Sequence, residues 1–300
     1  YNGSSPYQAP ATLNVIPHVE LNQGGHYVKG GLYSIAEALH KLAKKMGVTF
    51  HFNERIEKIN ISDSSVNGVT LTDGSIKPCD LLFANSDATD TIANLLPADA
   101  VSEKKRKKQK SLEPSCSGFV MLLGCSKVWP QLNHHNIFFS EDYREEFDDI
   151  FSKQRMPADP TIYVANTSAS DPSHAPENSS NLFILVNAPY LSNNIDWKNE
   201  EKRYKKQIIR KLQEYGLTDL SDHIEYSKTI TPRDFYQKYR SNKGSIYGTS
   251  SNNKLAAFMR PKNKSRSVKG LYLVGGSTHP GGGIPLVVQS AYNAMNLLSR

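Results

Sequence analysis

The amino-acid sequence predicts an α/β fold, of the α+β kind, in which two lobes share the chain in alternating segments. Three observations favour this fold class. Apolar residues recur at helical spacing over residues 31–46. Short apolar runs typical of buried strands follow at residues 79–84 and 271–274. A run of glycines then separates the last of these strands from a helix start at Pro285. Helices and strands therefore alternate within a chain that is long enough to bury a core.

The first third of the chain is expected to hold one helix and a small antiparallel unit. Gly47 should end the helix over residues 31–46. Asp73-Gly74 is typical of a hairpin turn. The polar residues 85–87 follow a buried strand, and their side chains can cap the next turn or helix. The strands are expected at residues 48–52, 56–61, 69–72 and 79–84.

The middle of the chain, residues 97–262, is expected to form a mixed lobe of strands and helices. Its helix should span residues 200–215, because four large side chains recur along one face. Those side chains are Tyr204, Ile208, Leu212 and Tyr215. The strands are expected at residues 119–124, 161–165 and 182–187.

Composition indicates a folded chain in a reducing, cytoplasmic compartment. The three cysteines, Cys79, Cys116 and Cys125, show no Cys-x-x-Cys pair, which argues against a disulfide framework. No apolar run approaches the roughly twenty residues needed to span a bilayer, so any membrane contact should be peripheral. The net charge of +7 is concentrated at residues 104–110, which carry six basic residues. Three interpretations stay open for this run: a solvated face, attraction to a membrane surface, or nucleic acid, which no accompanying motif supports.

The end of the chain carries the strongest motif. The apolar run 271–274 leads into Gly275 and Gly276, where the backbone is left bare. The glycines at 281–283 permit torsions that a Cβ would forbid, and Pro285 suits the first turn of a helix. Free N–H groups at such a helix start favour an anionic or electron-rich ligand. A phosphate or the edge of a flavin would fit, whereas the alternative is a plain strand-to-helix turn.

The string Gly270-Leu-Tyr-Leu-Val-Gly-Gly-Ser-Thr-His-Pro-Gly-Gly-Gly-Ile-Pro285 resembles the C-terminal signature of the carotenoid (phytoene or diapophytoene) desaturases, which are FAD-dependent, amine-oxidase-like flavoproteins. Further segments resemble the same family in the same order along the chain. They lie at residues 5–10, 24–33, 137–151, 171–177, 194–197 and 231–235. Because several spaced segments recur in order, the resemblance covers nearly all of the chain.

The resemblance implies FAD as cofactor and assigns binding roles to eight residues. Gly275, Gly276 and Ser277 would lie along the ribityl and pyrophosphate groups. Gly283, Ile284, Pro285 and Leu286 would bring a helix start under the flavin ring, with the N–H groups of Ile284 and Leu286 facing its O2 edge. Ile56 would contact adenine through its backbone, although a plain core residue is the alternative.

No catalytic residue follows from motif spacing. His279 is a weak candidate, because it lies in the flavin-facing turn by resemblance and can titrate near neutrality. Shaping of the turn is the alternative role for this histidine. No metal site is expected, and the adjacent His134 and His135 would point to opposite faces of a strand. The sequence also lacks the motifs of metalloproteases, hydrolases and P-loop enzymes.

The resemblance implies an FAD-dependent enzyme that desaturates a hydrophobic polyene, a C30 or C40 carotenoid precursor such as phytoene or diapophytoene, with peripheral access to membrane lipid. A carotenoid oxygenase that forms terminal aldehydes is the first alternative. A noncatalytic fragment that binds lipid or a partner is the second.

The organisation of the chain is expected to be that of a C-terminal portion. No Gly-x-Gly-x-x-Gly string occurs, and the chain begins at Tyr1 without an initiator methionine, so the pyrophosphate-anchoring motif should lie upstream. We therefore expect the 300-residue chain to be inactive by itself, and a homo-oligomer is one way to cover a sheet edge left by a missing strand. The lobes are expected as a substrate-lobe segment at 1–23, an FAD-lobe segment at 24–96, a substrate-binding lobe at 97–262 and a final FAD-lobe segment at 263–300.

Overall fold

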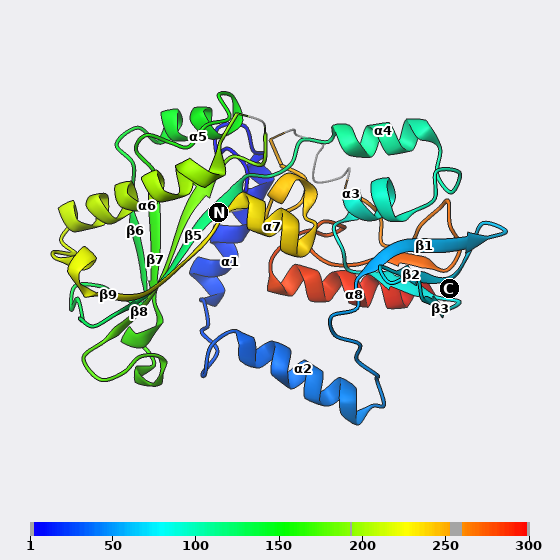
Figure 1. Ribbon diagram of the computed structural model, residues 1–300, viewed down its shortest axis with the longest axis horizontal. Coiled ribbons are helices and arrows are strands. Elements are labelled where there is room, and N and C mark those ends of the chain that lie inside the picture. Colours follow the sequence, from blue (N-terminus) through cyan, green and yellow to red (C-terminus); the bar gives the residue numbers. More distant parts are fainter. Residues whose placement is uncertain (1–2, 193, 253–259, 299–300) are drawn as a thin grey trace. The chain divides into compact units, whose positions relative to one another are not determined.

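The protein's structure is a computed structural model that describes residues 3–192, 194–252 and 260–298. Helices and strands alternate along this part of the chain, which confirms the predicted α/β class (Figure 1). The chain divides into two compact units, each built from segments that are far apart in sequence. Unit 1 consists of Tyr1–Pro10, His51–Ser117 and Pro232–Arg300, and unit 2 consists of Ala11–Phe50 and Gly118–Thr231.

The boundaries between the two units lie at different residues from the expected lobe boundaries. Residues 11–50 group with residues 118–231, and residues 232–262 group with the C-terminal segment. The expected interleaving of two bodies along the chain is nevertheless present. Which unit binds which ligand stays a prediction.

Unit 1 contains two small sheets. Three strands form an antiparallel sheet in the order β1-β2-β3, and the turn at Asp73-Gly74 joins β2 to β3 as expected. The other sheet pairs β4 with β10 in parallel, so that segments almost 190 residues apart lie side by side. The strands are β1 (Ile56–Ser62), β2 (Ser65–Leu71), β3 (Ile76–Pro78), β4 (Leu82–Ala84) and β10 (Leu271–Leu273).

The helices of unit 1 follow its strands. β4 leads into a short α3, which continues as one turn of π-helix, η2. β10 leads through the glycine turn into α8. The helices are α3 (Ala88–Asp90), η2 (Thr91–Leu95), α4 (Glu103–Ser111), α7 (Pro232–Tyr239), η6 (Asn242–Gly244) and α8 (Ile284–Leu298). The core of the unit gathers buried aliphatic side chains from β1, β2, β10 and η2.

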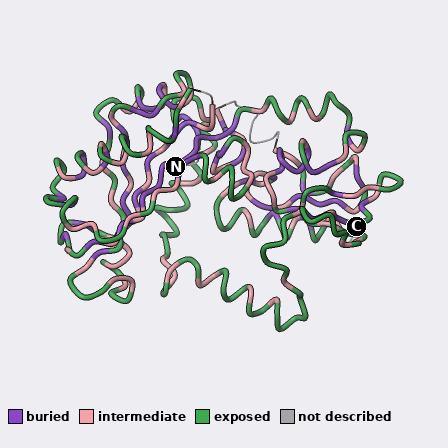
Figure 2. Tube along the Cα trace, in the orientation of Figure 1, coloured by how far each residue is buried: buried purple, intermediate pink, exposed green. Residues whose placement is uncertain are grey.

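Unit 2 is built on a five-stranded sheet in the order β6-β7-β8-β5-β9. The strands are β5 (Ser117–Cys125), β6 (His135–Phe138), β7 (Ile162–Asn166), β8 (Ser180–Ala188) and β9 (Ile224–Ile230). The helix α6 (Trp197–Glu214) packs on one face of this sheet through fully buried Tyr204, Ile208 and Leu212. The three central strands, β7, β8 and β5, are the buried ones, as the purple stretches in Figure 2 show. The predicted strands at 119–124, 161–165 and 182–187 and the helix near 200–215 are confirmed.

The remaining elements of unit 2 are short helices and two helices that precede the sheet in sequence. They are η1 (Ala11–Asn14), α1 (Val15–Gln23), α2 (Tyr33–Lys45), α5 (Tyr143–Phe151), η3 (Thr167–Ala169), η4 (Pro172–His174) and η5 (Leu220–His223). The predicted helix at 31–46 is confirmed as α2, although it contributes no buried residue (Figure 2). No helix in the described part of the chain is both long and apolar enough to cross a membrane.

The predicted strand at 48–52 is wrong. The residues after α2 close its C-terminus instead of pairing with a strand: the N–H of Val48 donates to the carbonyl of Ala43 at 3.0 Å. The ring of Phe50 packs edge-on against His40, with centroids 4.3 Å apart. The alternating apolar residues are therefore used to cap a helix, because helix capping and strand alternation produce similar short patterns.

The basic run at 104–110 forms α4, and its side chains do not share one environment. Arg106 is half-buried and turns inward, where its Nη1 donates to the carbonyls of Ile92 and Ala93 at 2.8 and 2.7 Å. Its Nη2 donates to the carbonyl of Pro97 at 2.7 Å. These carbonyls belong to η2 or to the residues that follow it, so Arg106 satisfies acceptors that a helix end leaves without partners.

We expect Arg106→Gln to lower the free energy of unfolding by about 2 kcal/mol, because charged donors to several carbonyls are lost together. The matched control is Lys107→Gln, which removes the same charge from an exposed pair with Glu103 and should change stability by less than about 0.5 kcal/mol. Urea denaturation of both variants measures the difference. Equal stabilities would contradict the structural role of Arg106.

Candidate functional site

The turn between β10 and α8 admits only glycine at position 275. Gly275 has a φ of +97°, and a Cβ placed on it would lie 2.2 Å from Oδ1 of Asn85. Asn85 directly follows β4, the parallel partner of β10, so the ends of both strands meet at this point. The N–H of Gly275 donates to Oγ of the buried Ser290 on α8 at 2.7 Å. The glycine therefore lets two strand ends and a helix approach closely.

Buried polar side chains fix the backbone of this turn. Oγ1 of Thr278 donates to the carbonyl of Gly275 at 2.9 Å. Nδ2 of Asn263 donates to the carbonyls of Leu273 and His279, at 3.0 and 2.8 Å. Thr278 and Asn263 are both buried, so these bonds form away from water. The turn is thus held in shape before any ligand binds.

Arg260 supports the same turn from outside the motif. Its Nη1 donates to the carbonyl of Gly276 at 3.0 Å, and a Cβ on Gly281 would meet this guanidinium at 3.0 Å. Burial lowers the pKa of Arg260 from its usual value. A guanidinium stays charged despite such a shift, so the turn carries a fixed positive charge next to its carbonyls.

Tyr247 and Gly248 also pack on the glycine turn. A Cβ on Gly248 would lie 2.9 Å from Cα of Ser277, and a Cβ on Gly282 would lie 3.5 Å from the ring of Tyr247. Burial raises the pKa of Tyr247 to about 12, so its hydroxyl stays protonated at neutral pH. The glycine turn is therefore closely packed on the side of Tyr247 and Gly248.

The start of α8 is exposed. Gly283 has a φ of +104°, and among the described residues, its two chain neighbours aside, no heavy atom lies within 4 Å of the position that a Cβ would take. Ile284 and Leu286 are 47% and 42% exposed. The first intrahelical bond runs from the N–H of Val287 to the carbonyl of Gly283, and the N–H groups before it are those that a helix cannot satisfy internally. The start of α8 is therefore open to solvent, and its backbone N–H groups can donate hydrogen bonds to a ligand.

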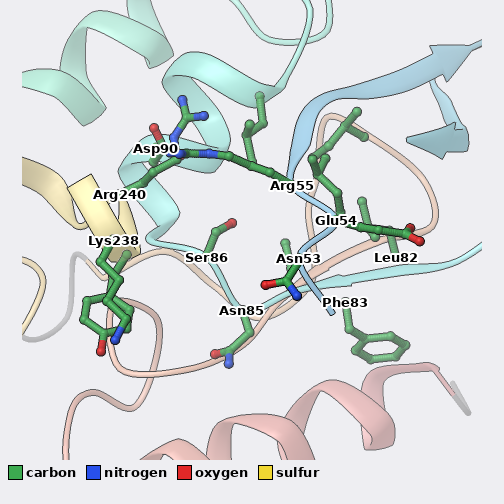
Figure 3. Close-up of a pocket in the computed structure, with 15 residues that line it drawn as sticks. Asn53, Glu54, Arg55, Leu82, Phe83, Asn85, Ser86, Asp90, Lys238 and Arg240 are labelled. Atoms are coloured by element: carbon green, nitrogen blue, oxygen red, sulfur yellow. The ribbon is translucent and has the colours of Figure 1, made fainter. Parts of the chain in front are cut away.

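A cavity of about 460 Å³ lies beside the ends of β1 and β4 (Figure 3). The half-buried Ile56 lines it, at the start of β1. The side chains of Asn53, Asn85 and Ser86 supply polar groups around it. Its apolar walls come from β1, β4 and η2, and charged residues also line it: Glu54, Arg55, Asp90, Lys238 and Arg240. Small-molecule sites combine apolar walls with a few placed polar groups.

An ion pair and a helix cap border this cavity. Nε of Arg240 lies 2.9 Å from Oδ2 of the buried Asp90. Figure 3 shows these two side chains next to each other. Asp87 caps α3 by accepting from the N–H of Thr89 at 2.8 Å. Burial raises the pKa of Asp87, although backbone hydrogen bonds to its carboxylate act in the opposite direction. Oγ of Ser277 accepts from the N–H of Ala88 at 2.9 Å, which ties the glycine turn to the start of α3.

All eight residues that the sequence nominated for cofactor binding lie in unit 1. Ile56 lines the cavity, and Gly275 touches Asn85 of the same cavity. Gly276 lies close to Gly282, because a Cβ on Gly276 would be 3.4 Å from the Cα of Gly282. The structure thus joins the two nominated regions through Asn85. Their contact with a cofactor stays a prediction.

The backbone groups of His279 form hydrogen bonds that hold the glycine turn in place. Its N–H donates to the carbonyl of Pro261 at 3.0 Å and its carbonyl accepts from Asn263 at 2.8 Å. The peptide bond between His279 and Pro280 is cis. His279 does not line the cavity at Ile56. A catalytic role for its ring stays a prediction.

Sequence reasoning missed several residues that build the site. Arg260 and Asn263 carry no periodic or motif signal, and their partners are 10 to 16 residues away in sequence. Arg240 lies 150 residues from Asp90. The one usable signal lies at residues 85–87, where polar side chains follow a buried strand, and this pattern by itself predicts only a helix cap.

The family described as flavin containing amine oxidoreductase matches residues 5–297. A 1-hydroxycarotenoid 3,4-desaturase of Flavobacterium sp. (strain P99-3) is 39% identical over 300 residues, covering 99% of this chain and 60% of the relative. A 4,4'-diaponeurosporene oxygenase of Staphylococcus aureus (strain MRSA252) is 38% identical over 290 residues, covering 97% of this chain and 58% of the relative.

Two solved structures share the fold. An oxidoreductase from Methanosarcina mazei superposes with a TM-score of 0.53 at 19% identity, covering 90% of this chain and 55% of the other. A Pyrococcus furiosus protein superposes with a TM-score of 0.51 at 18% identity, covering 90% and 52%. The chain belongs to the flavin containing amine oxidoreductase family. It resembles carotenoid desaturases and oxygenases within it, and it spans 60% and 58% of the length of the two curated relatives.

We expect Gly275→Ala to destabilise unit 1 by about 3 kcal/mol, because a Cβ there overlaps Asn85 and the backbone torsion disfavours any side chain. Gly283→Ala is the matched control, since its Cβ enters open space and its cost is the backbone torsion alone, about 1 kcal/mol. Thermal unfolding of both variants gives the comparison. A Gly275→Ala protein as stable as Gly283→Ala would contradict the packing of the turn.

Proposed function

We propose that the protein is an FAD-dependent oxidoreductase that desaturates a C30 or C40 carotenoid precursor such as phytoene or diapophytoene. The observation that carries the proposal is the preshaped glycine turn, which presents an open helix start beside Gly283 in a family defined by flavin. The names of the relatives support the substrate class, because one acts as a hydroxycarotenoid desaturase and another as a diaponeurosporene oxygenase.

The residues present fit an FAD molecule. The open space at Gly283 and the exposed N–H groups of the α8 start suit the electron-rich edge of an isoalloxazine ring. The bare backbone at Gly275 and Gly276 suits a close-lying ribityl and pyrophosphate chain. The cavity at Ile56 suits an adenine ring held by backbone groups. When bound, the flavin supplies the acceptor for the hydrogens that desaturation removes.

The chain's own contribution is binding and orientation. Thr278, Asn263 and Arg260 hold the turn rigid, so the helix start keeps one direction toward the ring. A fixed arrangement of donors needs no reorganisation when the cofactor changes charge. This binding role requires no acid or base from the protein.

Unit 2 offers an apolar surface suited to a polyene. The sheet face opposite α6 carries Ile137, Tyr163 and Leu185 in direct register across β6, β7 and β8. Ile137 is 55% exposed, and Tyr163 and Leu185 are half-buried. Burying such side chains against a hydrocarbon chain removes apolar area from water on both partners, which favours binding.

An oxygenase that forms terminal aldehydes is the second candidate function. The relatives named desaturase and oxygenase match this chain at 39% and 38% identity, so similarity does not separate them. We further propose a cytoplasmic protein with peripheral membrane contact, because its substrate dissolves in the bilayer and α4 carries a concentrated positive charge.

We expect Gly283→Val to abolish flavin binding without unfolding the protein, because the added side chain would fill the space proposed for the ring. The measurement is flavin absorbance of protein purified from the complete reading frame, with circular dichroism as the test of folding. Gly283→Ala serves as a milder control with partial loss. Stoichiometric flavin in the valine variant would place the ring elsewhere.

We expect expression of the complete reading frame in a host that makes phytoene or diapophytoene to convert the colourless precursor into products with longer conjugated systems. Chromatography with absorption spectra identifies them. Terminal aldehydes would identify the oxygenase instead. Unchanged precursor in cells that contain flavin-loaded protein would refute both carotenoid functions.

A further inference from the structure

A second cavity of about 310 Å³ lies in unit 1, between α4 and residues 260–266. It is distinct from the cavity at Ile56, with which it shares no lining residue. Its volume lies at the lower end of the range of about 300 to 1,000 Å³ that small-molecule sites occupy. The proposed flavin positions do not use it.

The inner surface of this second cavity is aliphatic. Buried side chains from η2, from the residues between η2 and α4, and from β10 form it, and they belong to the core of unit 1. They are Ile92, Leu96, Val101, Leu271 and Leu273. Leu112, just after α4, is half-buried and extends this surface toward the opening. An apolar chain laid here would leave water without disturbing any polar group.

The lining of the cavity also carries six basic side chains and no carboxylate. They are Lys105, Lys108, Arg260, Lys262, Lys264 and Arg266. Within the described part of the chain, none of the six forms an ion pair with Asp or Glu. Lys105, Arg260 and Lys264 donate to neutral groups instead, as when Nζ of Lys105 donates to Oγ of Ser267 at 3.0 Å. No ion pair with a described carboxylate therefore balances the positive charge gathered here.

The basic side chains of α4 point in different directions from the helix. Lys105 and Lys108 are three residues apart and line the cavity together with Gln109 and Leu112, which continue the same face. Arg106 turns into the core. Lys107 pairs with Glu103 at 2.8 Å and does not line the cavity. The basic run at 104–110 is therefore not uniformly solvated, because Lys105 and Lys108 border an apolar cavity.

We propose that this cavity binds an amphiphile with a phosphate-bearing head and an apolar chain. The chain lies on the aliphatic inner surface, and the head lies against Lys105, Lys108 and their basic neighbours. Phosphate accepts several hydrogen bonds and is attracted by clustered lysine and arginine. Two sources supply this chemistry: a phospholipid of an anionic membrane, or a soluble phosphate ester of a hydrocarbon chain. The site rests on the membrane contact of the proposed function, but it needs no flavin.

The test is a calorimetric titration of the purified protein with dihexanoyl-phosphatidylglycerol kept below its micelle concentration. We expect saturable binding of one molecule per chain. The double variant Lys105→Gln, Lys108→Gln should weaken binding at least tenfold. The matched control, Lys104→Gln with Lys107→Gln, removes the same charge from the same helix and should change the Kd by less than twofold. Equal weakening in both, or no saturable binding to the wild type, would overturn the proposal.

The contribution of the apolar chain is tested with Leu112→Ser. This variant should weaken binding of the short-chain lipid several-fold while leaving binding of inorganic pyrophosphate unchanged. Pyrophosphate binding as tight as the lipid's would show an anion site without a chain, which contradicts the proposal. Circular dichroism and thermal unfolding establish that each variant is folded.

Vesicles distinguish the two sources. If phosphatidylglycerol vesicles sediment the wild type but not the Lys105, Lys108 variant, the amphiphile is a membrane lipid. If the monomeric lipid binds and the vesicles do not, it is a soluble phosphate ester. Flavin absorbance and carotenoid products of the same variants report separately on the proposed oxidoreductase, so failure of one proposal leaves the other measurable.

Discussion

Three residues of β4 pair in parallel with three residues of β10, and the arrangement of unit 1 depends on this pairing. It joins segments that are far apart in sequence and brings their ends together, so that Asn85 fills the space beside Gly275. Ligands of open α/β sheets bind at the carboxyl ends of parallel strands. The cavity at Ile56, the start of α3 and the glycine turn all lie at these strand ends.

Arg260 connects the two sites proposed for this unit. It donates to the carbonyl of Gly276 in the glycine turn and also lines the cavity beside α4. One side chain therefore contacts both the element proposed to hold the flavin and the cavity proposed to hold an anionic amphiphile. A lipid head that drew the guanidinium toward itself would weaken its bond to the turn, which gives a physical route for coupling membrane contact to cofactor binding.

Much of the fold could be predicted from sequence because its signals are local. Helical spacing identified α2 and α6, and apolar runs identified β5, β7, β8 and β10. The strand predicted at residues 48–52 is wrong, because the alternating apolar residues there cap the C-terminus of α2. The glycines at 275, 276 and 283 marked the turn, but Arg260, Asn263 and Arg240 act through distant partners that no local pattern encodes. Resemblance supplied the nominated roles, and geometry supplied the reason for the glycines.

The central claim is that the glycine turn and the cavity at Ile56 hold one flavin molecule together. Hydrogen exchange of protein from the complete reading frame, measured with and without FAD, tests it most directly. We expect FAD to slow exchange in peptides covering residues 275–287 and 53–60, while the edge strand at 224–230 of unit 2 exchanges at the same rate. Unchanged exchange in 275–287 when FAD is stoichiometrically bound would contradict it.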